Sequence, residues 1–195
     1  MHARGFVHCD LKAKHFLMFK GEWKLVDFDN AQPDGASHAA CCTLQYAAPE
    51  VVVARRNGAP LVASAAIDVW AMAIILCHLF SGRPLHGDDE LDGLEERLAT
   101  RPADVASALE RAAGLSDPQR RLLHEMVAVA PNERRGLREV LSKSFFRAGE
   151  DTEQAKHVEV LALFSSPTKW GGSSSGEEHA QSAVLVGPRP ATTGS

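Results

Sequence analysis

The sequence has no long apolar run and few cysteines. Its most apolar segment, residues 66–80, is interrupted by Asp68 and His78, and it is shorter than the roughly 20 apolar residues of a membrane span. It therefore predicts a helix that is buried on most sides. The 4 cysteines show no CxxC spacing and no zinc-finger histidine nearby. We expect free thiols in a reducing compartment, which favours an intracellular, cytoplasmic protein.

The chain also lacks an excess of charge and any run of basic residues. Its formal net charge is -4, from 21 Lys and Arg against 25 Asp and Glu. Nucleic acids and anionic membranes are recognised through clustered positive charge, so we expect neither as a partner. Apolar residues make up 45% of the chain and charged residues 24%, which is the balance of a globular protein.

Two short apolar runs near the N-terminus predict a β-hairpin. Residues 16–19 and 22–26 are rich in aromatic and branched side chains, and Lys20-Gly21 between them suits a tight turn. Asp10 precedes the first run and Asp27 follows the second, so the hairpin should bring the two acids together. Two convergent acids could serve glycoside hydrolysis, a divalent metal or phosphoryl transfer, and either could instead merely cap a turn.

The rest of the chain divides into loop, helices and tail. Residues 31–65 contain several Pro and Gly breakers and should be mostly loop. Residues 90–144 show helical periodicity, with Asp104 and Ser116 as N-cap candidates.

The C-terminal part differs in composition from what precedes it. We expect a first domain over residues 1–147, then a linker and an isolated strand over 148–167 that begins a second domain or lies on the first. Residues 168–195 are rich in Gly, Ser, Pro and Thr and predict a disordered tail.

Five short motifs follow one another in a fixed order. They are HCDLKAKH (8–15), KLVDFD (24–29), TLQYAAPE (43–50), DVWAMAIILCHLFSGRPL (68–85) and APNERR (130–135). In this order they resemble the catalytic loop, metal loop, activation segment, buried central helix and DPxxR element of eukaryotic protein kinases. The resemblance implies an α+β fold, mostly α, that corresponds to a kinase C-terminal lobe with a small β-hairpin.

The resemblance also implies roles for single residues, with ATP and Mg²⁺ as cofactors and a protein as substrate or docking partner. Asp10 would accept or orient the substrate hydroxyl, and Lys12 would steady the phosphate of ATP. Asp27 would bind Mg²⁺, and His15 stands at the second metal-ligand position. Thr43 would tie the peptide-docking loop to the catalytic loop. Lys12 and Thr43 together favour the serine/threonine type.

Three further residues receive structural roles from the same resemblance. Glu50 should form a buried ion pair with Arg134, within hydrogen-bond reach. Asp68 should bind backbone amides of the catalytic loop.

Three positions depart from the family pattern. His15 replaces an Asn, although an imidazole is a poor ligand for a hard cation. Asp29 replaces a Gly and adds a negative charge near the metal position. Cys9 replaces an Arg, so a phosphate on the activation segment would lack its usual partner, and we expect no activation by phosphorylation there.

The glycine-rich loop and the lysine strand of kinases should lie before the catalytic loop. Since only seven residues precede His8, we expect the N-terminal lobe to be absent from this chain. Three hypotheses remain: a divergent or incomplete serine/threonine kinase domain, a pseudokinase-like protein-binding module without catalysis, and a hydrolase built on the two acids. The hydrolase leaves every motif after residue 43 unexplained.

Overall fold

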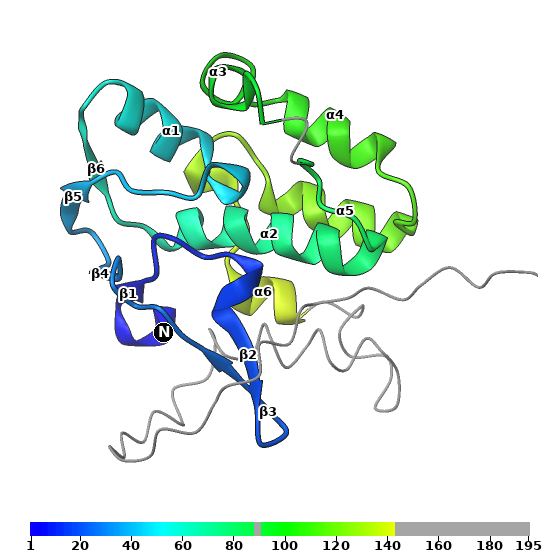
Figure 1. Ribbon diagram of the computed structural model, residues 1–195, viewed down its shortest axis with the longest axis horizontal. Coiled ribbons are helices and arrows are strands. Elements are labelled where there is room, and N and C mark those ends of the chain that lie inside the picture. The colour runs from blue at the N-terminus through cyan, green and yellow to red at the C-terminus, as the bar shows by residue number, and fades with distance from the viewer. Residues whose placement is uncertain (88–90, 143–195) are drawn as a thin grey trace, which may run out of the picture.

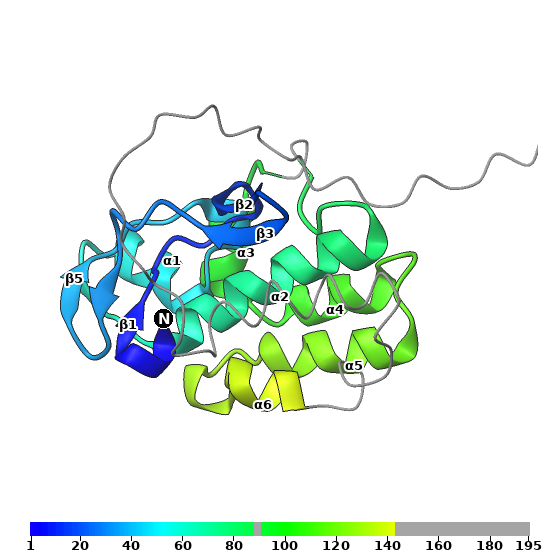
Figure 2. The same cartoon turned by 90° about the horizontal axis from the view of Figure 1, so that it is seen from below.

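One long helix organises the fold. The computed structural model describes residues 1–87 and 91–142. In it α2 (Ala65–Ser81) crosses the middle of the molecule with α5 (Asp117–Met126) beside it (Figures 1 and 2). Ser64 caps its start by accepting a hydrogen bond from the Ala66 amide, and Gly82 ends it in the left-handed conformation with a φ of 72°. The predicted helix over 66–80 is therefore present, one residue longer at each end.

Shorter helices pack around α2, and a hairpin projects away from it (Figure 1). The helices are α1 (Pro49–Arg56), α3 (Leu94–Thr100), α4 (Asp104–Arg111), α5 (Asp117–Met126) and α6 (Leu137–Ser142). Helix α1 contacts α3, α3 contacts α4, and α4 contacts α5, which returns the chain to α2. The fully buried side chains come mostly from these helices and α2: Trp70, Met72, Ile75, Leu76, Leu94, Leu98, Leu109, Leu123 and Met126.

The strands form three antiparallel pairs. The predicted hairpin consists of β2 (Phe16–Phe19) and β3 (Glu22–Leu25). Its turn residues Lys20 and Gly21 both have positive φ, 50° and 78°, as a two-residue hairpin turn requires. The other pairs are β1 (Phe6–Val7) with β4 (Gln32–Pro33), and β5 (Ser37–Ala39) with β6 (Pro60–Val62).

Two local predictions need correction. Residues 31–65 are not mostly loop, since they hold α1 as well as β4, β5 and β6. Asp104 is the first residue of α4 and Ala103 holds the cap position, because the chain already turns into helical dihedrals there. The prediction for Ser116 is confirmed: it caps α5 in a capping box with Gln119.

The linker, strand and tail predicted over 148–195 lie outside the described residues. Among the residues that are described, no helix has both the length and the apolarity to cross a membrane.

Candidate active site

Asp10, Lys12 and Thr43 form a hydrogen-bonded cluster, although Thr43 is more than 30 positions away in sequence. The Lys12 ammonium donates to Asp10 Oδ2 at 2.8 Å and to Thr43 Oγ1 at 3.0 Å. The Thr43 amide donates to Asp10 Oδ1 at 2.9 Å. Both oxygens of Asp10 are thus held, and the segment after β5 is tied to the loop before the hairpin.

The electrostatics of this cluster keep Asp10 ionised. Burial alone would raise the pKa of the Asp10 carboxyl, but hydrogen bonds from Lys12 and Thr43 outweigh it and hold the pKa below its ordinary value. A carboxylate in this state can accept a hydrogen bond from a hydroxyl and orient it. It stays anionic throughout the neutral range.

Asp68, at the start of α2, fixes the backbone just before Asp10. Its buried carboxylate accepts hydrogen bonds from the amides of His8 at 2.8 Å and Cys9 at 3.0 Å, and lies 2.7 Å from His2 Nε2. These bonds hold Cys9 at a φ of 67°, which is unfavourable for a residue with a Cβ. Asp68 therefore binds two backbone amides of the loop that the resemblance implied as its partner.

Cys9 brings no positive charge to this loop. Its side chain is buried, and burial together with the nearby Asp68 carboxylate raises the pKa of the thiol to about 12. The thiol therefore remains neutral at physiological pH and is neither a nucleophile nor a phosphate partner.

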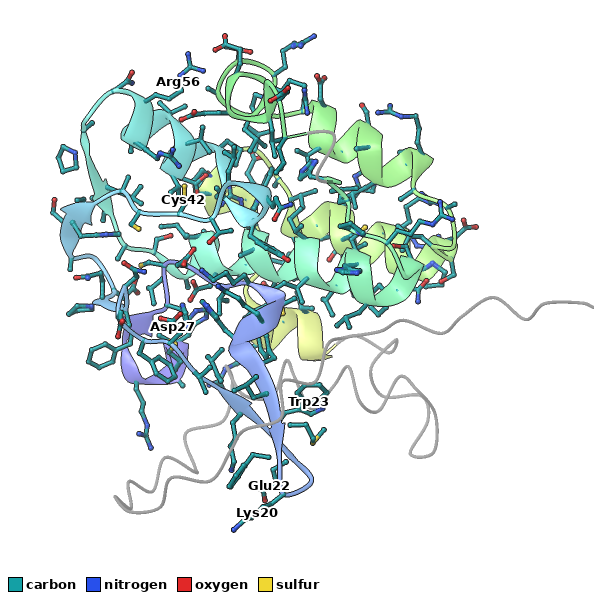
Figure 3. The ribbon with its side chains drawn as sticks, in the orientation of Figure 1. Lys20, Glu22, Trp23, Asp27, Cys42 and Arg56 are labelled. Atoms are coloured by element: carbon teal, nitrogen blue, oxygen red, sulfur yellow. The ribbon has the colours of Figure 1, made fainter. Side chains whose placement is uncertain are left out.

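The hairpin brings His15 and Asp27 together at its base. Strand β2 begins directly after His15, and the Val26 amide donates to the His15 carbonyl at 3.0 Å. His15 Nε2 then lies 2.9 Å from Asp27 Oδ2. In Figure 3 Asp27 lies at this base, whereas Lys20 and Glu22 mark the distant tip.

The two members of this pair differ in environment. The His15 side chain is 3% exposed and the Asp27 side chain 43%. Despite the short distance, neither ring nitrogen of His15 has a hydrogen-bond partner among the described residues. Burial, then the positive charge of Lys12, lowers the pKa of His15, while Asp27 and Asp10 act in the opposite direction. The two acids therefore act in the same direction on one imidazole.

Three aromatic side chains near the site were given no role by the sequence. The His8 ring stacks on His15, with centroids 5.4 Å apart, and lies 5.5 Å from the Phe28 ring. His2 contacts Asp68, as described above. His8 and Phe28 belong to quoted motifs, but a lone buried histidine or phenylalanine is read as core, so the sequence offered no signal for these contacts.

Arg134, in the segment between α5 and α6, pairs with Glu50 of α1. The Arg134 guanidinium donates to the two carboxylate oxygens of Glu50 at 2.6 and 2.7 Å. It also stacks over the Trp70 ring at 4.9 Å from the centroid. The contact predicted for Glu50 and Arg134 is present, in the bidentate geometry that suits a guanidinium and a carboxylate.

The side chains at this site limit how it could bind a metal ion. Among residues 1–87 and 91–142, no group of three or more His, Cys, Asp or Glu side chains is arranged to hold a metal ion. Asp27 offers an exposed oxygen ligand of the kind that Mg²⁺ prefers. A cation there would need ligands besides Asp27, among them water and a bound phosphate compound.

Comparison with known proteins adds a family to this geometry. A family model of the protein kinase domain matches residues 1–146. The chain is 31% identical over 165 residues to CBL-interacting serine/threonine-protein kinase 15 of Arabidopsis thaliana. The aligned region covers 81% of the chain and 37% of that protein. It is 26% identical over 174 residues to the probable serine/threonine-protein kinase KIN1 homolog of Encephalitozoon cuniculi, covering 84% of the chain and 28% of that protein. The chain therefore spans about a third of the length of these curated relatives.

Proposed function

This chain belongs to the protein kinase domain family, and on that premise we propose that it carries the phosphoryl-transfer side of a serine/threonine kinase site. The observation that supports the proposal most is the cluster in which Asp10 is bonded to both Lys12 and Thr43. A kinase needs a carboxylate to orient the attacking hydroxyl and a cation beside the transferred phosphate. One cluster offers both groups.

Each member of the cluster has a distinct task in this proposal. Asp10, anionic because its pKa is depressed, accepts the hydrogen bond of the substrate hydroxyl and aims the oxygen. Lys12 balances negative charge on the phosphate, and its second bond to Thr43 fixes the segment on which a peptide substrate lies. ATP with Mg²⁺ supplies the phosphoryl group, and Asp27 is the residue that would hold the cation.

A protein serine or threonine is the proposed acceptor. The Lys12–Thr43 bond joins the catalytic loop to the activation segment in the way the resemblance implies for this type. The relatives described above are named serine/threonine kinases, which supports the same acceptor.

A pseudokinase-like binding module is the second candidate, and the residues near the expected metal position favour it. His15 stands where the family has an oxygen ligand, and Asp29 adds an exposed negative charge two residues after Asp27. Repulsion of phosphates and loss of a ligand would both weaken ATP binding. Such a module would dock a protein partner without catalysis.

The deciding experiment measures Mg²⁺-dependent transfer of labelled phosphate to a protein substrate. It is run on the 195-residue chain and on a longer form that includes a glycine-rich loop and lysine strand. We expect transfer from the longer form only, because phosphoryl transfer depends on positioning the nucleotide from both sides. Robust transfer by the 195-residue chain would contradict this expectation.

Variants of the longer form separate the proposed roles. Asp10→Asn should lower turnover by roughly 10²–10⁴-fold, the range for loss of a positioned base, with little effect on ATP binding. Asp27→Asn should weaken Mg²⁺-dependent ATP binding, and Asp34→Asn, at an exposed acid of a neighbouring loop, serves as the control. A longer form that binds protein partners but transfers no phosphate would favour the binding module.

A further inference from the structure

We propose that the cation of this site is held by the His15 imidazole together with Asp27, and that this donor pair selects Mn²⁺ or Co²⁺ over Mg²⁺. The inference rests on the proposed function, because the phosphates of a nucleotide would supply further ligands. It goes beyond that function by assigning a metal-binding role to the residue that departs from the family pattern and by naming the class of cation.

The spacing of the two donor atoms suits a shared cation. His15 Nε2 and Asp27 Oδ2 are 2.9 Å apart. Adjacent ligands of an octahedral cation, each about 2.1 Å from the metal, are about 3 Å from one another. One cation can therefore contact both atoms with little movement of either side chain.

The imidazole is also held in place with its nitrogen unused. The His15 ring is buried, stacked on the His8 ring, and fixed through the backbone bond to Val26. Nε2 of His15 lies 2.9 Å from Asp27 Oδ2, but it makes no contact with hydrogen-bond geometry among the described residues. A buried polar atom without a hydrogen bond is destabilising. This nitrogen points to Asp27, whose side chain is 43% exposed, so a cation from solvent can reach the pair.

The donor types determine which cation fits. Mg²⁺ prefers oxygen ligands and gives up its waters reluctantly. An imidazole nitrogen suits transition-metal cations, for which affinity generally rises from Mn²⁺ through Co²⁺ to Ni²⁺ and Cu²⁺, and Mn²⁺ in addition takes carboxylate and water oxygens. Replacing an oxygen ligand by His15 therefore moves the preference of the site away from Mg²⁺.

A second histidine–carboxylate pair provides a matched control. His124 Nε2 lies 2.6 Å from Glu110 Oε1, and this nitrogen also lacks a hydrogen-bond partner within the described part of the chain. Here, however, Arg120 Nε lies 3.9 Å from the other oxygen of Glu110. The guanidinium takes up charge of the very carboxylate that would bind a cation, whereas the Lys12 charge near His15 is balanced by its own bond to Asp10. The His124–Glu110 pair should therefore not bind a cation.

The test measures metal binding directly on the full 195-residue chain. Mn²⁺ is titrated with and without ATP, its free concentration is followed by electron paramagnetic resonance, and Mg²⁺ is added as competitor. We expect His15→Asn to weaken Mn²⁺ binding at least tenfold and to make Mg²⁺ a better competitor, while His124→Asn changes neither. The visible spectrum of bound Co²⁺ should show nitrogen ligation that His15→Asn removes.

Several outcomes would overturn the inference. The native chain could show no preference for Mn²⁺ over Mg²⁺. The His15→Asn variant could leave the competition between Mg²⁺ and Mn²⁺ unchanged, or the His124→Asn variant could lose as much Mn²⁺ binding as His15→Asn. Asp27→Asn keeps the test meaningful if His15→Asn fails to fold, because loss of this exposed ligand should weaken both cations. Mg²⁺-dependent ATP binding without Mn²⁺ preference would refute the inference alone, whereas absence of ATP binding by the longer form would refute the proposed function.

Discussion

Arg134 and His15 are both buried polar residues, yet their hydrogen-bonding states are opposite. The Arg134 guanidinium uses all five of its N–H donors, on the Glu50 carboxylate and on the carbonyls of Ala66, Ala128 and Val129. His15, at the hairpin base, has no hydrogen-bond partner for either ring nitrogen among the described residues. The contrast separates a group that holds the fold from a group that we propose binds a ligand.

Of the substitutions considered, removal of Arg134 should lower the free energy of unfolding most. Arg134→Met leaves Glu50 without its partner and several carbonyls without donors, so we expect the free energy of unfolding to fall by about 3–5 kcal/mol. The side chain of Glu50 is 23% exposed, which places the value near the lower end. Urea denaturation would measure the change.

The neighbouring arginine is the control for this prediction. Arg135 is 48% exposed and pairs with Glu125 and Glu139 at the surface. Arg135→Met should therefore change stability by less than about 1 kcal/mol. Equal effects of the two substitutions would show that Arg134 does not anchor the fold.

Asp68→Asn tests the second fully bonded group. The carboxylate accepts from two amides and contacts His2, and an amide side chain has only one oxygen with which to accept. We expect a loss of about 1.5–3 kcal/mol, the range for hydrogen bonds to a charged group. Hydrogen exchange of the His8 and Cys9 amides should speed up, whereas Asp92→Asn, at an exposed acid, should leave them protected.

Asp10 predicts a pH dependence. Its pKa is lower in the folded chain than in the unfolded chain, so its carboxylate stabilises the fold above the ordinary pKa of about 4 and this contribution disappears as pH falls through the folded value. Asp10→Asn should therefore cost about 1 kcal/mol at pH 7. The difference from the native chain should shrink below about pH 4.

Unfolding curves at several pH values check this prediction. A difference that stays constant down to acid pH would contradict the assigned cause. Asp34→Asn, exposed and without a charged partner in the contacts described here, should show no such trend.

A substitution in the hairpin turn should change stability least. Lys20 adopts a φ of 50°, and Asn tolerates this conformation better in a two-residue turn before Gly. Lys20→Asn should raise stability by up to about 1 kcal/mol. Lys14→Asn, at an exposed position outside the turn, should not, and thermal unfolding of both variants would decide.

Local features of the chain could be predicted because they depend on neighbouring residues. The hairpin turn follows from Lys20-Gly21, the α5 cap from Ser116 with Gln119, and the end of α2 from Gly82. The expected contacts of Glu50 and Asp68 came from family resemblance, and their geometry agrees with it. Helix α1 was missed, because it is short, begins at Pro49 within a segment rich in breakers, and is supported by packing on α3.

The sequence by itself determined the order of the motifs, the buried central helix and the hairpin that lies between Asp10 and Asp27. Only the tertiary structure decided which groups face one another: His2 against Asp68, His8 against His15 and Phe28, and the His15 Nε2 against Asp27. The physical reason is that these contacts depend on backbone positions such as the positive φ of Cys9 and Asp27. Packing of distant segments imposes those conformations, and no short stretch of sequence prefers them.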